Sequence, residues 1–158
     1  DEESQEVDYL QKEIQSDIKG IALIPDFELS TKASRQVLPR EFVYAQAVQA
    51  SSRSNVLVAA LWQEDWQNVS RIVEKDLFHE PYRKTLIPFL TPVRKLAKEK
   101  EAIGTYLSGA GPTVMVLSSK DKATSIVQHL QEQLPRELGN YIIRVLSVDP
   151  LGVRVEKR

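Results

Sequence analysis

The segment that most constrains the fold has the sequence Ser108-Gly109-Ala110-Gly111-Pro112-Thr113 and lies between two short apolar runs. Residues 103–107 and 114–117 are predicted to be β-strands, so this segment, called here the glycine hairpin, joins strand to strand. Its two glycines lack Cβ atoms, which permits positive φ angles and close approach of another segment or an anion to the backbone N–H groups. The glycine hairpin therefore either only reverses the chain or faces a ligand.

Several kinds of catalytic or binding site are excluded by the sequence. A Walker-type phosphate loop leads from a strand into a helix, and no segment fits Gly-x4-Gly-Lys-Ser/Thr. No serine, histidine and carboxylate have a spacing that indicates a nucleophilic triad. Two distant histidines without any cysteine give no metal-ligand spacing. We therefore assign no catalytic nucleophile and no metal ligand.

Hydrophobic periodicity around the glycine hairpin predicts an α+β fold. We expect strands at 7–14, 20–24, 103–107, 114–117, 141–148 and 153–155, and helices at 31–39, 40–62, 64–75, from 81 onward and at 123–134. The order is strand, several helices, two strands in a hairpin, helix and strand. This is the ferredoxin-like βαββαβ plait, with additional helices in its first crossover.

Two details of the predicted helices can be tested directly. In the helix over 40–62, one face should pack inward, and it consists of Phe42, Ala45, Val48, Ser52, Val56 and Ala59. In the helix that begins near Pro81, Pro88 and Pro92 each remove a backbone donor. We expect a kink or a break at these two prolines.

Length, charge and cysteine content limit the class of protein. A chain of 158 residues is long enough for one domain with a hydrophobic core. The net charge of -1 gives no reason to expect a nucleic acid or an anionic membrane as partner. The absence of cysteine is typical of a cytoplasmic protein, and no apolar run approaches the ~20 residues that cross a bilayer.

Three segments together resemble a known family. They are residues 31–39 (Thr-Lys-Ala-Ser-Arg-Gln-Val-Leu-Pro), residues 79–83 (His-Glu-Pro-Tyr-Arg) followed by Leu-Ile-Pro at 86–88, and the glycine hairpin. In this order and spacing they resemble the C-terminal half of bacterial homoserine kinases, a branch of the GHMP kinase superfamily. The hairpin matches a motif of the whole superfamily, whereas residues 79–83 are more specific to the homoserine branch. We expect residues 1–19 to be a disordered start and domain junction, and residues 20–158 to be a GHMP kinase C-terminal domain.

The resemblance implies an activity and the partners that it needs. Such enzymes transfer phosphate from ATP to L-homoserine with Mg²⁺, in threonine biosynthesis in the cytoplasm. Their N-terminal domain carries a Pro-x3-Gly-Leu-Gly-Ser-Ser-type phosphate loop, and this sequence contains no such segment. We therefore expect this chain to be the substrate-side domain, inactive and without bound cofactor when isolated. Its expected partners are L-homoserine and an N-terminal GHMP domain, and the sequence leaves open a homodimer.

Two predicted helix starts carry an arginine that could bind an anion. Thr31 and Arg35 are four residues apart and share a helical face, while Pro81 at a first helical position places Arg83 in the first turn. Each helix start is expected to combine unsatisfied backbone N–H groups with a guanidinium, which favours a carboxylate or phosphate. The alternative is that both arginines pair with surface carboxylates.

The resemblance implies specific roles for these residues. Arg35 and Arg83 would hold the α-carboxylate of the substrate, and Thr31 would orient the end that accepts phosphate. His79 would be either a polar wall of the pocket or a loop histidine bonded to backbone. The glycine hairpin would support the phosphate loop from the opposite side of the cleft. Three other functions remain open: a sibling GHMP kinase for another small alcohol, a non-catalytic amino-acid-binding module and a dimerisation domain.

Overall fold

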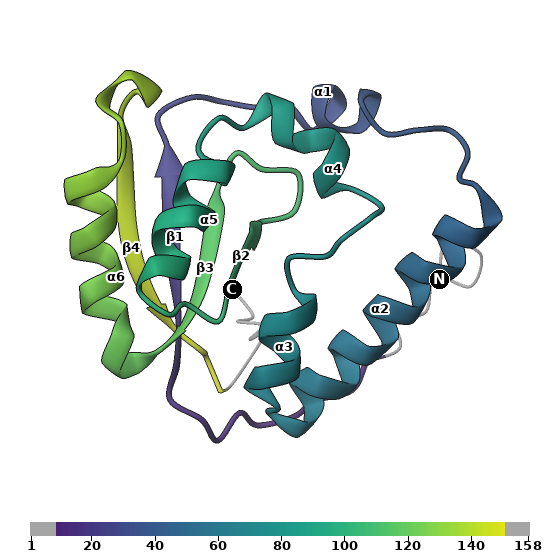
Figure 1. Cartoon of the computed structure of the whole chain (residues 1–158), viewed down its shortest axis with the longest axis horizontal. Coiled ribbons are helices and arrows are strands. Elements are labelled where there is room, and N and C mark those ends of the chain that lie inside the picture. The colour runs from purple at the N-terminus through teal and green to yellow at the C-terminus, as the bar shows by residue number, and fades with distance from the viewer. Residues whose placement is uncertain (1–8, 151–158) are drawn as a thin grey trace, which may run out of the picture.

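A four-stranded antiparallel sheet forms the centre of the fold in the computed structural model, which describes residues 9–150 (Figure 1). Its strands are β1 (Ile18–Pro25), β2 (Gly104–Leu107), β3 (Val114–Ser119) and β4 (Tyr141–Ser147). The spatial order is β2-β3-β1-β4, and every neighbouring pair is antiparallel. This order is that of the βαββαβ plait, so the predicted α+β class is confirmed.

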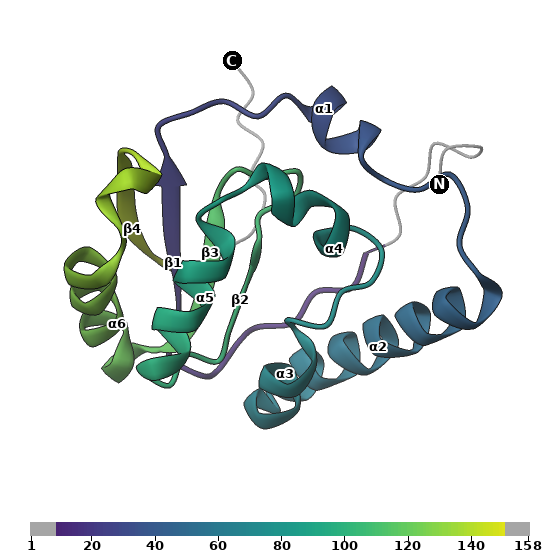
Figure 2. The same cartoon turned by 45° about the horizontal axis from the view of Figure 1, so that its top comes forward.

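Helices fill the first crossover and cover one face of the sheet. Between β1 and β2 lie α1 (Thr31–Gln36), α2 (Tyr44–Gln63), α3 (Trp66–Ile72), α4 (Glu80–Arg83), the 3-10 turn η1 (Lys84–Leu86) and α5 (Leu90–Glu99). The second crossover contains α6 (Lys120–Gln133) and the 3-10 turn η2 (Arg136–Leu138). Both views show α5 and α6 against the same face of the sheet (Figure 2). In the part of the chain described, no helix is long and apolar enough to cross a membrane.

The core lies between the sheet and the pair α5 and α6. The two central strands contribute every second residue to it, because successive strand side chains point to opposite faces. The helices contribute residues three and four apart, and burying one such large side chain stabilises the fold by ~1.5–3 kcal/mol. The buried set is Ile21, Leu23, Val114, Val116, Ile87, Phe89, Leu90, Val93, Ala97, Ala123, Ile126, Leu130 and Leu134.

The two prolines near α5 have different effects. The helix breaks before Leu90, so the prediction of an interruption at Pro88 is confirmed. The prediction for Pro92 is wrong, because Phe89 is the N-cap residue and Pro92 falls in the first turn of α5. An N–H group in the first turn has no partner within the helix, so its absence costs nothing there.

The long helix α2 begins at Tyr44 rather than at residue 40, and it buries a different face from the predicted one. Val48 and Val56, in the predicted inward stripe, are 50% and 47% exposed, whereas Ala50 and Ala60 are buried. Figure 2 shows α2 set apart from the sheet, beside α3. The reason is that α2 packs on α3 and not on the sheet, and periodicity finds an apolar face without identifying its neighbour.

The segment before β1 is fastened by Glu64, the C-cap residue of α2. Its carboxylate accepts hydrogen bonds from the backbone N–H groups of Gln15 at 2.9 Å and Ser16 at 2.7 Å, and also from the Ser16 hydroxyl. The Gln15 N–H, followed by the Ser16 donors, lowers the pKa of Glu64 to about 2. The strand predicted over 7–14 is wrong for residues 9–14, which are irregular. The rest of that strand, and the one predicted at 153–155, lie outside the described residues.

The glycine hairpin has the predicted position between β2 and β3. Its ends are closed by the Ser108 N–H donating to the Thr113 carbonyl and the Gly111 N–H donating to the Ser108 carbonyl, both at 3.0 Å. Gly109 and Gly111 have φ angles of 57° and 85°, in the left-handed region. A Cβ at Gly111 would lie 2.5 Å from Ile87 Cδ1, whereas at Gly109 it would meet nothing within 4 Å. Gly111 is therefore favoured by its backbone conformation, and a side chain there would also displace the end of the buried Ile87 side chain.

We predict that Glu64→Gln removes part of the acid sensitivity of folding. A carboxyl whose pKa is depressed in the folded state stabilises the fold above its unfolded pKa, and this stabilisation is lost as the pH falls. For Glu64 this stabilisation is lost as the pH falls from about 4.5, the ordinary pKa of the carboxyl, to about 2, its pKa in the folded protein. Urea unfolding midpoints between pH 5 and pH 2 should therefore fall less steeply in Glu64→Gln than in the parent protein.

Glu101→Gln is the matched control for this prediction. Glu101 also has a positive φ of 59° and a pKa lowered by a hydrogen bond to Lys122. However, its side chain is 76% exposed, against 10% for Glu64, so solvent screens the pair. Glu101→Gln should change the pH dependence of the urea unfolding midpoint less than Glu64→Gln does. Equal changes in the two variants would contradict the role given to Glu64.

We also predict that the two hairpin glycines differ in their tolerance of alanine. Gly109→Ala should cost about 1–2 kcal/mol of unfolding free energy, from the left-handed backbone alone. Gly111→Ala adds a clash with Ile87, so its cost should reach about 2–5 kcal/mol. Denaturant unfolding of both variants measures the difference, and equal losses would show that Ile87 does not restrict the hairpin.

Candidate functional site

A cavity of about 520 Å³ lies where α1, α4 and the glycine hairpin meet. In Figure 1 these three segments lie together at one end of the molecule. The structure brings six of the residues singled out in the sequence to the walls of this cavity, namely Thr31, Arg35, His79, Arg83, Gly109 and Ala110. The other four residues of the hairpin, Ser108, Gly111, Pro112 and Thr113, are not among the residues that line it.

Arg83 connects the three segments around the cavity. Its Nε donates to the Ser34 carbonyl at 3.2 Å, and its Nη1 donates to the Gly109 carbonyl at 3.1 Å. The Ser34 hydroxyl, which is fully buried, donates to the Ala110 carbonyl at 2.7 Å. Arg83 therefore has a structural role at this place, in addition to presenting its guanidinium to the cavity.

Arg35 reaches the same cavity from α1. The Ser30 side chain caps this helix by accepting a hydrogen bond from the Ala33 N–H at 3.1 Å. Thr31 and Arg35 lie one helical turn apart, and both side chains are exposed. Two guanidinium groups thus face one cavity, an arrangement that suits a carboxylate or a phosphate.

The backbone N–H groups before α4 are occupied by Asp76. Its carboxylate accepts from the N–H groups of Phe78, His79 and Glu80, at 2.9, 2.9 and 2.6 Å. Burial, the largest single influence, acts to raise the pKa of Asp76, but the three N–H groups outweigh it and hold the pKa below its ordinary value. The expectation of unsatisfied donors at this helix start is therefore wrong, and the attraction for an anion comes from the arginines.

His79 occupies the N-cap position of α4 and half faces solvent. Its side chain is 54% exposed, and its Nδ1 lies 3.8 Å from Asp76 Oδ1. Its ring packs edge-on against Phe78, with centroids 6.2 Å apart. His79 thus forms a polar part of the cavity wall beside Asp76.

Five further residues line the cavity that the sequence analysis did not single out. They are Val73, Asp76, Glu80, Tyr106 and Leu107. Asp76 could have been found, because an aspartate side chain often accepts hydrogen bonds from backbone N–H groups a few residues further on. Tyr106 and Leu107 end the strand before the hairpin, and burial raises the pKa of the Tyr106 hydroxyl. Burial also raises the pKa of Glu80, although Arg94 partly offsets this effect.

The glycine hairpin beside the cavity uses part of its own backbone hydrogen-bonding capacity internally. Two N–H groups of the hairpin, those of Ser108 and Gly111, donate within the hairpin itself. Within residues 9–150 there is no group of three His, Cys, Asp or Glu side chains that could hold a metal ion.

Two bacterial homoserine kinases are similar to this chain in sequence. The chain is 50% identical to homoserine kinase of Streptococcus sanguinis over 141 residues, which cover 89% of this chain and 48% of that protein. It is 48% identical to homoserine kinase of Bacillus cereus over 138 residues, which cover 87% of this chain and 45% of that protein. The chain therefore spans about half the length of these relatives.

The comparison of structures agrees with that of sequences. The crystal structure of homoserine kinase from Cytophaga hutchinsonii aligns with a TM-score of 0.78 and 29% identity, over 90% of this chain and 44% of that one. A mevalonate diphosphate decarboxylase from Legionella pneumophila, 18% identical with a TM-score of 0.50, shares the fold alone. The family described as GHMP kinases C terminal matches residues 57–136, about half of the chain. The chain therefore belongs to the GHMP kinases, and the part of them that it matches is their C-terminal domain.

Proposed function

We propose that this chain is the substrate-side domain of an ATP-dependent homoserine kinase. The observation that carries the proposal is the single cavity faced by both Arg35 and Arg83. The relatives named homoserine kinase, about half identical in sequence, support the choice of substrate. The domain would extend over residues 20–158, with residues 1–19 forming the junction.

The residues of the cavity would bind and orient L-homoserine. Arg35 and Arg83 hold the α-carboxylate, because a planar guanidinium fixes the angle as well as the distance of its partner. Thr31 orients the hydroxyl end that accepts phosphate, and His79 forms the adjoining polar wall. Asp76 does not compete for the arginines, since its carboxylate is already bonded to backbone N–H groups.

Phosphoryl transfer would depend on positioning and charge neutralisation rather than on a nucleophile of the protein. ATP supplies the phosphate, and ATP and Mg²⁺ would be held by an N-terminal GHMP domain in the full-length protein. The glycine hairpin would support the phosphate loop of that domain across the cleft. The product would be O-phospho-L-homoserine, in threonine biosynthesis in the cytoplasm.

The proposal predicts that Arg35→Ala in the full-length protein weakens L-homoserine binding selectively. Loss of one charged contact to a carboxylate costs ~2–5 kcal/mol, so the KM for L-homoserine should rise by at least about 30-fold while the KM for ATP changes little. Arg35 suits this test better than Arg83, which also holds the Ser34 and Gly109 carbonyls. Steady-state kinetics with each substrate varied in turn make the measurement.

Arg40→Ala is the matched control, because Arg40 is exposed and does not line the cavity. Its KM for L-homoserine should stay within about twofold of the parent value, which corresponds to less than about 0.5 kcal/mol. Equal rises in the KM for both substrates in Arg35→Ala would contradict the assignment of Arg35 to the carboxylate.

The proposal also predicts where the rest of the kinase is encoded. The coding sequence before Asp1 should continue in frame and encode the glycine-rich Ser-Ser phosphate loop. The 158-residue chain alone should then show no ADP release that depends on L-homoserine, while the full-length protein should show it. A gene without such a loop would refute the proposed enzyme.

A further inference from the structure

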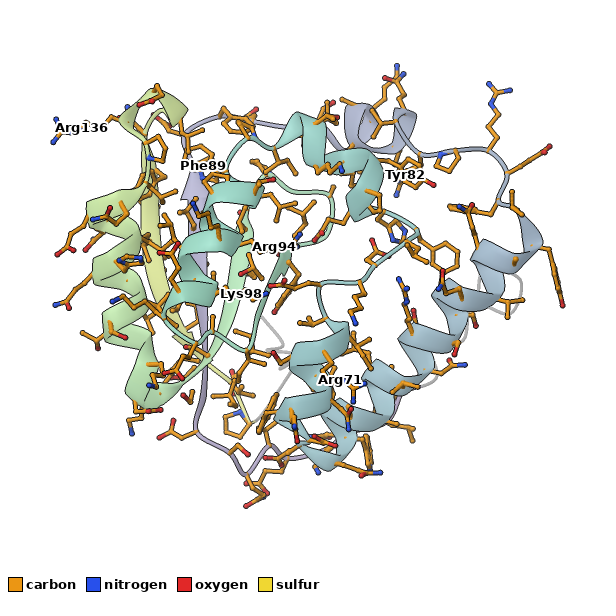
Figure 3. The ribbon with its side chains drawn as sticks, viewed as in Figure 1. Arg71, Tyr82, Phe89, Arg94, Lys98 and Arg136 are labelled. Atoms are coloured by element: carbon orange, nitrogen blue, oxygen red, sulfur yellow. The ribbon has the colours of Figure 1, made fainter. Side chains whose placement is uncertain are left out.

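Arg94 joins three segments that meet behind the cavity wall. From α5, its Nη2 donates to Glu80 Oε1 at 2.7 Å and to Glu80 Oε2 at 2.8 Å. The same nitrogen donates to the Thr105 carbonyl at 2.8 Å. Glu80 is the first residue of α4, and Thr105 belongs to β2. Figure 3 labels Arg94, which projects from α5 into the space between these elements.

Glu74 extends this group of contacts to the connection between α3 and α4. Its Oε1 accepts a hydrogen bond from the Thr105 N–H at 2.8 Å, and its Oε2 lies 3.5 Å from Arg94 Nε. Arg94 Nε is buried and forms no hydrogen bond with any part of the chain from residue 9 to residue 150. Arg94 thus lies between two carboxylates and one strand, and its side chain is largely shielded from solvent.

The partners of Arg94 adjoin residues that line the cavity on two sides. Glu80 follows His79 directly and lies one helical turn before Arg83. Thr105 precedes Tyr106 in the strand, and Glu74 lies two residues before Asp76. Because its carboxylate is bonded to Arg94, Glu80 is held toward α5 and not toward the arginines of the cavity. A movement of α4 relative to β2 would have to break these bonds.

We infer that Arg94 is a positioning residue for the acceptor cavity: it fixes α4, and with it Arg83, against β2. The inference rests on the proposed function, since it concerns the site assigned to L-homoserine. Arginine suits this task better than lysine, because its planar group presents several donors in fixed directions. Lysine carries its charge on a single nitrogen, which could replace Nη2 beside Glu80 and Thr105 but could not at the same time replace Nε beside Glu74.

Hydrogen exchange tests the positioning role without relying on kinase activity. In the full-length protein that contains this chain, we would compare Arg94→Met, Arg94→Lys and the control Lys98→Met by mass spectrometry. Lys98 is exposed and lies one turn further along α5, as Figure 3 shows. Backbone exchange over residues 76–86 should accelerate at least tenfold in Arg94→Met, less in Arg94→Lys and not in Lys98→Met. Exchange in β1 and β3 should stay unchanged.

Kinetics provide the second measurement. The KM for L-homoserine should rise at least tenfold in Arg94→Met and by a smaller factor in Arg94→Lys, with the KM for ATP within twofold of the parent value. An equal increase in exchange over the whole domain, or equal rises in both KM values, would overturn the inference. If Arg94→Met does not fold, Arg94→Lys alone carries both measurements.

The two proposals fail in different ways. A parent protein that does not phosphorylate L-homoserine contradicts the proposed function, while the exchange experiment still tests whether Arg94 fixes α4. Unchanged exchange over residues 76–86 in Arg94→Met overturns the role of Arg94, even in an active kinase.

Discussion

The hydrogen bonds of the Arg83 guanidinium are the contacts on which the rest of the site depends. They connect α4 to Ser34 in α1, 49 residues away in the sequence, and to Gly109, 26 residues away. The plait alone places these segments at the same end of the sheet without fixing their spacing. Arg83 sets this spacing, and the bond from Ser34 to the hairpin closes the ring of contacts. The cavity exists because these contacts hold together three segments that are far apart in the sequence, namely α1, α4 and the glycine hairpin.

The elements of the plait could be predicted from the sequence because each is specified locally. The short apolar runs of β1 and β3, the glycine hairpin and the stop at Pro88 all depend on near neighbours in the chain. The face that α2 buries could not be predicted, since Val48 is exposed and Ala50 is buried although they lie two residues apart in the same helix. Local patterns indicate that a helix has an apolar face, whereas tertiary packing decides which face is covered.

The candidate site likewise combines features that local sequence patterns predict with contacts that only the tertiary structure shows. Residues 31–35 and 79–83 were recognisable as segments with a helix start and an arginine, and the structure places both at one cavity. The bond between the Ser34 hydroxyl and the Ala110 carbonyl, by contrast, has no local signature, because its partners are 76 residues apart. The local hydrogen bonds of the Asp76 carboxylate could have been predicted from the sequence. They would have corrected the expectation of free N–H groups before α4.

The position of Arg83 has a consequence for the thermodynamics of a kinase built in this way. In the proposed kinase, one guanidinium would belong both to the acceptor end of the site and, through its bond to the Gly109 carbonyl, to the glycine hairpin on the nucleotide side. A ligand bound to this guanidinium would change the free energy of nucleotide binding next to the hairpin. A nucleotide that orders the hairpin would in turn change the free energy of ligand binding to the guanidinium. Linkage requires the two effects to be equal in size. Occupancy of either half would thus alter the affinity of the other by one common factor, without any movement of whole domains.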